Sequence, residues 1–85
     1  MEKELKPIGE ITHYYGGIGV AIVKFNKNVK TGDKICFKGA TTNFEQTIRS
    51  IQYDHKEIDE AKKGQEVGIK VNEKVRTGDK VCESE

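Results

Sequence analysis

Four side chains of this sequence are of types that could support nucleophilic or metal chemistry: Cys36, Cys82, His13 and His55. A nucleophile needs a base within hydrogen-bond reach and a third group that orients the base, and no local motif supplies that set. A metal site needs at least three converging ligands, and these four residues lack ligand spacing. The sequence therefore predicts a binding protein that is not an enzyme, with no catalytic residue, no metal site and no cofactor.

The two cysteines end two copies of one turn-and-strand unit, Val29-Lys-Thr-Gly-Asp-Lys-Ile-Cys36 and Val75-Arg-Thr-Gly-Asp-Lys-Val-Cys82. In each copy the glycine supplies the permissive backbone of a tight turn, and the aspartate can hydrogen-bond to neighbouring amides. Two copies are too few for a solenoid, so we expect them to close two similar corners of one barrel. Alternation along each strand predicts that both cysteines point away from the core, as an exposed pair of reduced thiols.

Between these turns the sequence reads as short strands separated by polar or glycine-containing loops. The stretch 66–72 has apolar residues at every second position, which is typical of a half-buried strand. The apolar pattern changes face near Ser50, which predicts a β-bulge there. An acidic cap at the start of 54–64, with a glutamate three residues on, predicts a short helix. Strands are expected at about 7–15, 18–25, 34–39, 44–53, 66–72 and 80–83. The expected fold is all-β, a small closed six-stranded Greek-key barrel with one short helix.

The chain has 85 residues, of which 34% are hydrophobic and 34% charged, and its formal net charge is +1. This length suits one domain, expected over 6–83, between a flexible tail at 1–5 and a short tail at 84–85. The near-neutral charge excludes a global field toward nucleic acid or an anionic membrane. A local excess of lysine over 24–38 reads as a solvated strand edge. No signal peptide and no run of about 18 apolar residues occur, so we expect a cytoplasmic protein without a membrane partner.

Several short motifs follow one another in a distinctive order along nearly the whole chain. They are Tyr15-Gly-Gly-Ile-Gly19, Val20-Ala-Ile-Val23, the first turn unit, Ile48-Arg-Ser-Ile51, Ala61-Lys-Lys-Gly-Gln-Glu-Val-Gly68 and Arg76-Thr-Gly-Asp-Lys-Val81. This order resembles domain two of elongation factor Tu and initiation factor two, which is a translation-protein β-barrel. The resemblance implies a stand-alone, non-catalytic, elongation factor-like module that contacts transfer RNA or ribosomal RNA. GTP is excluded as a ligand, because no Gly-x-x-x-x-Gly-Lys-Ser/Thr loop is present.

In elongation factor Tu this barrel helps to hold the aminoacylated end of transfer RNA, and the resemblance aligns Gln52 with its carboxylate and Lys70 with an apolar residue. Both substitutions change the chemistry of that contact. The candidate RNA contacts combine rings that stack on unpaired bases with side chains that hold phosphates. They are Tyr14, Tyr15, Lys24, Arg49, Gln52, His55, Lys70 and Arg76. The alternative is a protein-interaction module that docks in trans to a GTPase or an RNA-modifying enzyme, through an apolar patch near Tyr14, Tyr15 and Phe44.

Overall fold

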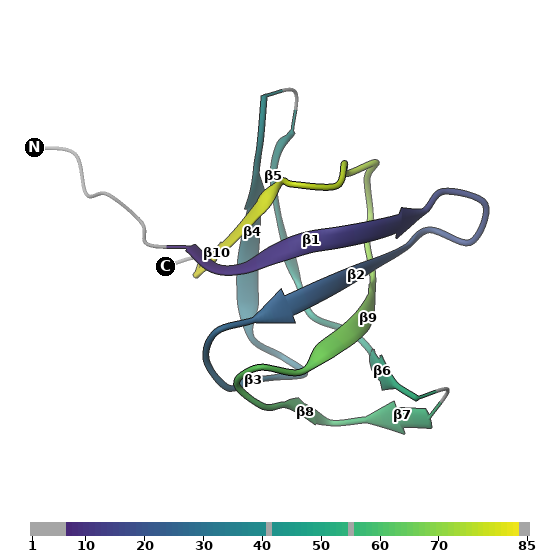
Figure 1. Ribbon diagram of the computed structural model, residues 1–85, viewed down its shortest axis with the longest axis vertical. Coiled ribbons are helices and arrows are strands. Elements are labelled where there is room, and N and C mark those ends of the chain that lie inside the picture. The colour runs from purple at the N-terminus through teal and green to yellow at the C-terminus, as the bar shows by residue number, and fades with distance from the viewer. Residues whose placement is uncertain (1–6, 41, 55, 84–85) are drawn as a thin grey trace, which may run out of the picture.

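A computed structural model of the chain describes residues 7–40, 42–54 and 56–83 (Figure 1). The strands are β1 Pro7–Tyr15, β2 Val20–Phe25, β3 Val29–Lys30, β4 Lys34–Lys38, β5 Asn43–Thr47, β6 Ile51–Tyr53, β7 Lys56–Ile58, β8 Glu60–Ala61, β9 Glu66–Lys70 and β10 Lys80–Glu83. Eight of them form one antiparallel sheet in the order β5-β4-β10-β1-β2-β9-β6-β7, and β3 pairs with β8 in a separate ribbon. The all-β class is confirmed. The tails predicted at 1–5 and 84–85 lie outside the described residues.

The core lies on the inner face of this curled sheet. Ala21, Val23 and Phe25 point inward from β2 and are almost completely buried. Val20 and Ile22 alternate with them and lie half-buried on the outer face. The apolar run in β2 has no polar face, so only the structure assigns which residues point into the core.

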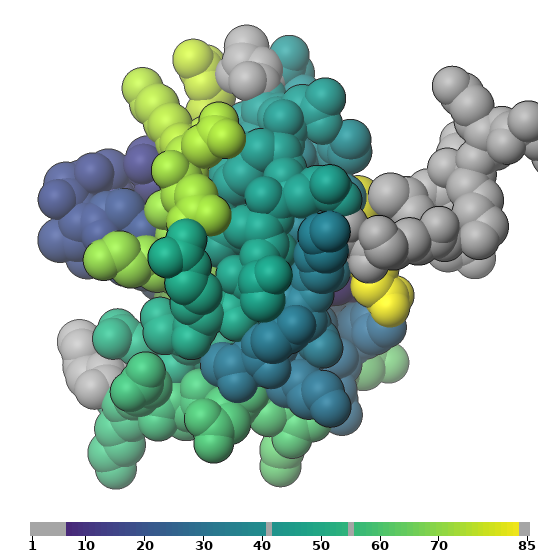
Figure 2. Space-filling model, turned by 180° about the vertical axis from the view of Figure 1, so that it is seen from behind, coloured from purple at the N-terminus to yellow at the C-terminus, as the bar shows by residue number. Residues whose placement is uncertain are grey.

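The predicted closed six-stranded barrel is wrong, because the large sheet has two separate ends, β5 and β7. A side chain spans the space between β5 and the end of β9. Gln46 donates a hydrogen bond from Nε2 to the backbone oxygen of Lys70 at 2.8 Å, and the backbone N–H of Asn72 donates to Gln46 Oε1 at 2.8 Å. Figure 2 shows β5 lying against the segment that follows β9 on the back face. The side-chain amide of Gln46 thus occupies the place where a closed barrel would have backbone hydrogen bonds between two strands.

The helix predicted over 54–64 is also wrong. This stretch turns at Asp54, where φ is 53°, and continues as β7 and β8. Ile58 and Ala61 fit the spacing of a helix face, but each lies opposite a strand residue from elsewhere in the chain, Ile51 and Val29 respectively. Strand pairing, within the β6–β7 hairpin and with the distant β3, outweighs the weak local helix signal.

The expected bulge near Ser50 is instead a break between β5 and β6, because residues 48–50 belong to no strand. Before the break, the chain pairs as β5 with β4. After the break, it pairs as β6 with β9. An actual irregularity of register lies in β1, where Ile11 pairs with Val23 and His13 with Ile22. Thr12 is the extra residue at this bulge.

Both repeated units form the tight turns expected of them. Gly32 and Gly78 each have φ 95°, in the left-handed region that favours glycine. The backbone N–H of Lys30 donates to the carboxylate of Asp33, and that of Arg76 donates to Asp79. Each turn also holds a buried isoleucine from another segment. The glycine N–H donates to the isoleucine oxygen and the isoleucine N–H to the aspartate oxygen, with Ile48 in the first turn and Ile11 in the second.

The two copies meet at their cysteines, because Cys36 and Cys82 lie directly opposite each other where β4 pairs with β10. Their exposed fractions are 2% and 4%, so the expectation of an exposed thiol pair is wrong. Alternation assigns the face of the sheet on which a side chain lies, but not whether that face is covered. Three consecutive residues of β4, Ile35, Cys36 and Phe37, are buried.

Within the described parts of the chain, the structure contains no helix with the length and apolar character needed to cross a membrane. The predicted cytoplasmic location stays a prediction.

Candidate functional site

The outer face of β1, β2, β9 and β6 carries several apolar side chains that are exposed or half-buried. Residues opposite each other in an antiparallel sheet point to the same side, so the register defines rows across this face. The rows are Tyr15, Val20 and Lys70; His13, Ile22, Gly68 and Gln52; and Glu10, Lys24 and Glu66. The face therefore changes from apolar beside the β1–β2 loop to charged at the other end of β2.

A hollow of about 380 Å³ lies on this face, and we call it the outer-face groove. Its lining residues are Tyr15, Ile18, Val20, Ile22, Gln52, Asp54, Glu66 and Gly68. Ile18 has an exposed fraction of 65% and Tyr15 of 48%, so the apolar wall faces solvent. A surface of this kind is typical of a binding site for an apolar group.

Gly68 keeps the floor of the groove open. It is buried in β9, and a Cβ atom at this position would lie 3.2 Å from Val20 Cγ1 and 3.6 Å from Ile22 Cδ1. Any larger side chain at this position would therefore fill the space beside Val20 and Ile22. The absence of a side chain at Gly68 creates the depth of the groove.

The two ends of the groove are held by local contacts. Gly19, where φ is 67°, donates its N–H to the Tyr15 oxygen at 2.9 Å, which closes the β1–β2 loop that carries Ile18. The ring of Tyr15 lies 4.3 Å from that of His13, between centroids. At the other end, the bulged Thr12 donates from its hydroxyl to Glu66 Oε2 at 2.9 Å. The aromatic wall and one acidic rim residue are thus positioned by the fold.

The structure brings some of the predicted RNA contacts together at this groove and leaves others elsewhere. Tyr15 and Gln52 line it, and Lys70 lies beside Val20 at its edge. Lys24 lies in the charged row, opposite Glu66. Contact of these residues with RNA stays a prediction from the sequence.

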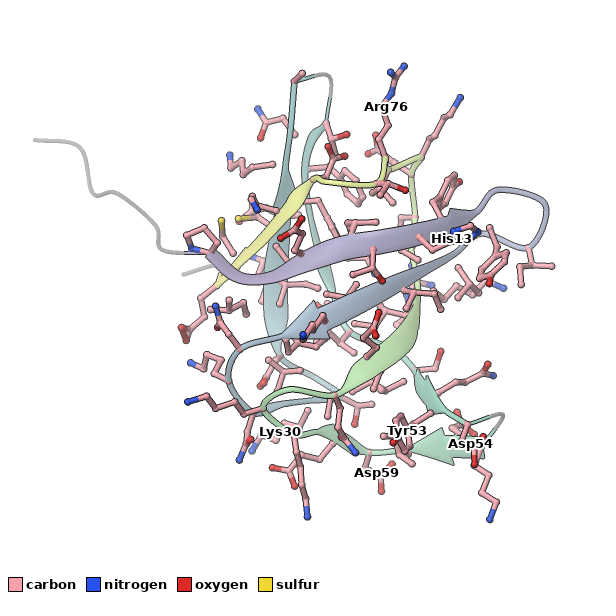
Figure 3. All side chains as sticks on the ribbon, in the orientation of Figure 1. His13, Lys30, Tyr53, Asp54, Asp59 and Arg76 are labelled. Carbon is pink, nitrogen blue, oxygen red and sulfur yellow. The ribbon has the colours of Figure 1, made fainter. Side chains whose placement is uncertain are left out.

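The remaining candidates lie outside the groove. Tyr14 packs against the core, and Arg49 donates a hydrogen bond to Asn72 Oδ1. Arg76 lies in the second turn, at the end of the molecule opposite Tyr53 and Asp54 in Figure 3. His55 lies outside the described residues. The RNA candidates therefore do not form one surface.

The apolar patch expected near Tyr14, Tyr15 and Phe44 is not formed as described. Phe44 stacks on Phe37, with ring centroids 4.8 Å apart, and packs on the core from β5. The exposed apolar surface is made instead by Tyr15, Ile18 and the outward side chains of β2. The signal that could have indicated it was the doubly apolar run of β2 beside the Gly-rich loop.

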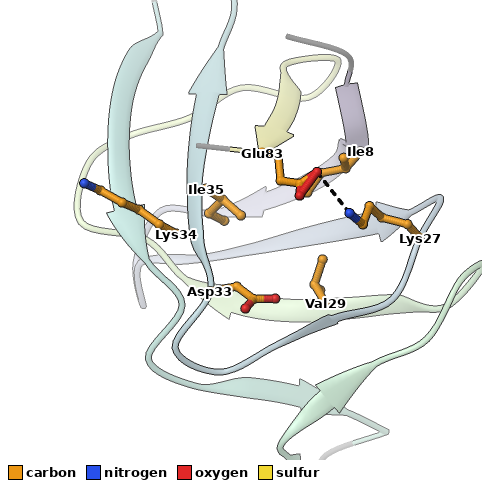
Figure 4. Close-up of a pocket in the computed structure, with 7 residues that line it drawn as sticks. All are labelled: Ile8, Lys27, Val29, Asp33, Lys34, Ile35 and Glu83. Atoms are coloured by element: carbon orange, nitrogen blue, oxygen red, sulfur yellow. Dashed lines mark hydrogen bonds and ion pairs between the residues drawn. The ribbon is translucent and has the colours of Figure 1, made fainter. Parts of the chain in front are cut away.

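Two other hollows carry charged residues that already have partners. Figure 4 shows one of about 160 Å³, where Lys27 Nζ contacts Glu83 Oε1 at 3.0 Å. Another, of about 450 Å³, includes Lys80, which contacts Glu10 at 3.0 Å. Among the residues that the structure describes, no group of three or more His, Cys, Asp or Glu side chains could hold a metal ion.

The buried cysteine pair is a poor source of thiolate. Burial raises the pKa of the Cys36 thiol above its ordinary value of 9.0, and the neighbouring Cys82 thiol raises it further. Since the thiolate is the nucleophilic form, Cys36 is mostly unreactive near neutral pH.

Comparison with known proteins finds a similar fold in a solved C-terminal domain. No protein-family model matches the chain. A Methanocaldococcus jannaschii protein named as an uncharacterised protease is 40% identical over 65 residues, which is 75% of this chain. The chain spans only 16% of that relative. The solved C-terminal domain of a Geobacillus thermoleovorans protein classed as a U32 peptidase superposes with a TM-score of 0.87 at 25% identity, covering 100% of both chains. Its selenomethionine variant gives 0.86 at 27% identity, covering 92% of this chain and 99% of that one.

These matches point to the C-terminal domain of U32 peptidases. The assignment to domain two of elongation factor Tu and initiation factor two is therefore wrong, and so is the elongation factor-like function inferred from it. Docking in trans to a GTPase or an RNA-modifying enzyme gains no support from these relatives either. The prediction that the chain is not an enzyme is contradicted, because the relatives are named as a protease and a peptidase. Turn motifs and strand order recur among small β domains, which explains why they misled the family assignment.

Proposed function

We propose that this chain serves a peptidase in the same way as a U32-type C-terminal domain does, and that its outer-face groove binds an extended polypeptide. The observation that carries the proposal is the match over 100% of both chains to the solved C-terminal domain, at a TM-score of 0.87. The partial match to a protein named as a protease, at 40% identity, supports the same assignment.

The chemistry of the groove suits a polypeptide ligand. Its floor and one wall are apolar, with Ile22 and Val20 beside the space above Gly68. Gln52 lines the same space and can donate to or accept from a peptide group. An apolar hollow with few polar groups is the usual form of a site that holds one side chain and orients its backbone.

A titration of the isotope-labelled chain with casein, a polypeptide without stable folded structure, tests this proposal. We expect amide shifts to cluster at Tyr15, Ile18, Ile22 and Gly68. An Ile18→Ser variant should bind several-fold more weakly without loss of stability, because Ile18 is 65% exposed. Tyr53→Ser is the matched control, since Tyr53 is 44% exposed but does not line the groove. Shifts spread evenly over the chain, or equal weakening by the two variants, would contradict the proposal.

A further inference from the structure

The outer-face groove has an apolar part and an acidic part, and their arrangement indicates which polypeptides it takes. Resting on the function proposed above, we infer that it selects an extended peptide in which an apolar side chain is followed closely by lysine or arginine. The apolar side chain lies over Gly68, and the basic side chain reaches two carboxylates at the groove's far end.

The apolar part is preformed. Tyr15, Ile18 and Val20 make one wall, and the missing side chain at Gly68 leaves room for an inserted group. The volume of about 380 Å³ falls within the range of small-ligand pockets, at roughly 300–1,000 Å³. Burying an apolar side chain here would also cover Ile18, the most exposed large hydrophobic residue of the described chain.

The acidic part consists of Asp54 and Glu66. On β6 and β9, Gln52 lies opposite Gly68, and Asp54 is the turn residue that directly follows the end of β6. Both residues line the groove, so a carboxylate from the β6–β7 turn and one from β9 border the same space. Two like charges that border one hollow repel each other, and a cation between them relieves that repulsion.

The charges around this part favour a basic ligand. Among the described residues that line the groove, Asp54 and Glu66 are the charged ones, and both are negative. Lys24 lies beside Glu66 on β2 but on the side away from Asp54, and Lys70 lies at the opposite end of β9. The hydrogen bond from Thr12 to Glu66 Oε2 holds that carboxylate in place. Arginine is the better complement, because its planar guanidinium can reach two carboxylates at once.

Three fluorescent peptides that differ at one position test the inference: Ser-Leu-Gly-Arg-Gly-Ser, whose leucine and arginine point to the same side of an extended chain, and the same peptide with glutamine or glutamate in place of arginine. We expect the arginine peptide to bind about fivefold more tightly than the glutamine peptide at low salt, since exposed ion pairs contribute modestly. The glutamate peptide should bind most weakly. The preference should shrink as salt is added, because screening acts on exposed charges.

Two variants separate the parts of the groove. Asp54→Asn combined with Glu66→Gln should bring the ratio of arginine to glutamine binding close to one. Gly68→Ala should weaken the binding of all three peptides by a similar factor, because it fills the floor without changing charge.

A wild-type ratio of arginine-peptide to glutamine-peptide binding near one would overturn the inferred selectivity and leave the proposed function standing. If none of the peptides and no casein binds, the proposed function fails as well. Sedimentation at the same concentrations must show a monomer, since a dimer that buries Ile18 would assign the groove to a second copy of the chain.

Discussion

The side chain of Gln46 joins two parts of the sheet that no backbone ladder connects, so its replacement offers a sharp test of the fold. Both of its hydrogen bonds are 2.8 Å long, and the residue has an exposed fraction of 5%. Gln46→Leu keeps a side chain of similar size but removes both bonds. The two lost hydrogen bonds connect Gln46 to the backbone of Lys70 and Asn72, at the end of β9, which is the strand that carries Gly68.

The magnitude follows from the two lost bonds. Each net hydrogen bond contributes about 1 kcal/mol, and the change removes the two that Gln46 makes with the backbone of Lys70 and Asn72. We therefore expect a loss of about 1–2 kcal/mol in the free energy of unfolding, or roughly 4–16 °C in Tm for a domain of this size. Gln46→Glu should cost more at neutral pH, because a carboxylate oxygen would face the carbonyl oxygen of Lys70.

Equilibrium unfolding in urea, followed by circular dichroism, measures these losses. The Gln46→Glu loss should shrink below about pH 4, where a protonated carboxyl can again donate to Lys70, whereas the Gln46→Leu loss should be independent of pH. In the Gln46→Glu variant, the introduced carboxyl has a higher pKa in the folded chain than in the unfolded chain. The stability of this variant is therefore greatest at low pH and falls as pH rises. Thr47→Val, an exposed change on the same strand, is the control. If Gln46→Leu unfolds at the same urea concentration as the unmodified chain, the side-chain bridge does not connect the two parts of the sheet.

The repeated turns and the cysteine pair support two further predictions. Asp79 is buried and accepts from both the Thr42 hydroxyl and the Arg76 N–H, whereas half-buried Asp33 accepts from one backbone N–H in the equivalent turn. Asp79→Ala should therefore cost about 2–3 kcal/mol in urea unfolding and Asp33→Ala about 1 kcal/mol, and equal losses would contradict this ranking. The raised pKa of Cys36 means that its stabilising effect is complete below its ordinary pKa of 9.0 and is lost as pH rises above it. Unfolding measured from pH 8 to 10.5 should show a steeper loss for the unmodified chain than for Cys36→Ser, and parallel curves would argue against it.

The sequence determined the local features that depend on neighbouring residues. The Thr-Gly-Asp turns formed as expected, because a glycine at positive φ and an aspartate that accepts a nearby N–H are local requirements. The all-β class and the approximate positions of most strands followed from apolar alternation. These signals recur in many small β domains, so they did not identify the family.

The tertiary structure decided everything that depends on residues far apart in the chain. Ala61 became a strand residue because the distant Val29 lies opposite it. The large sheet stayed open, and the Gln46 side chain joins β5 to the end of β9 without a backbone ladder. The cysteines were buried because both faces of β4 are covered where they meet.

The groove shows the same division. Tyr15 and Gln52 could be picked out as polar or aromatic candidates, but their residue types did not place them beside one another. Ile18 and Gly68 were not recognised as site residues, because an apolar loop residue and a strand glycine carry no distinctive chemistry in isolation. Their role arises from the pairing of β2 with β9 and of β9 with β6, which sets an apolar wall, an open floor and two carboxylates around one space. Strand register depends on contacts across the whole sheet, and so it was the folded structure, rather than the order of residues, that assembled this site.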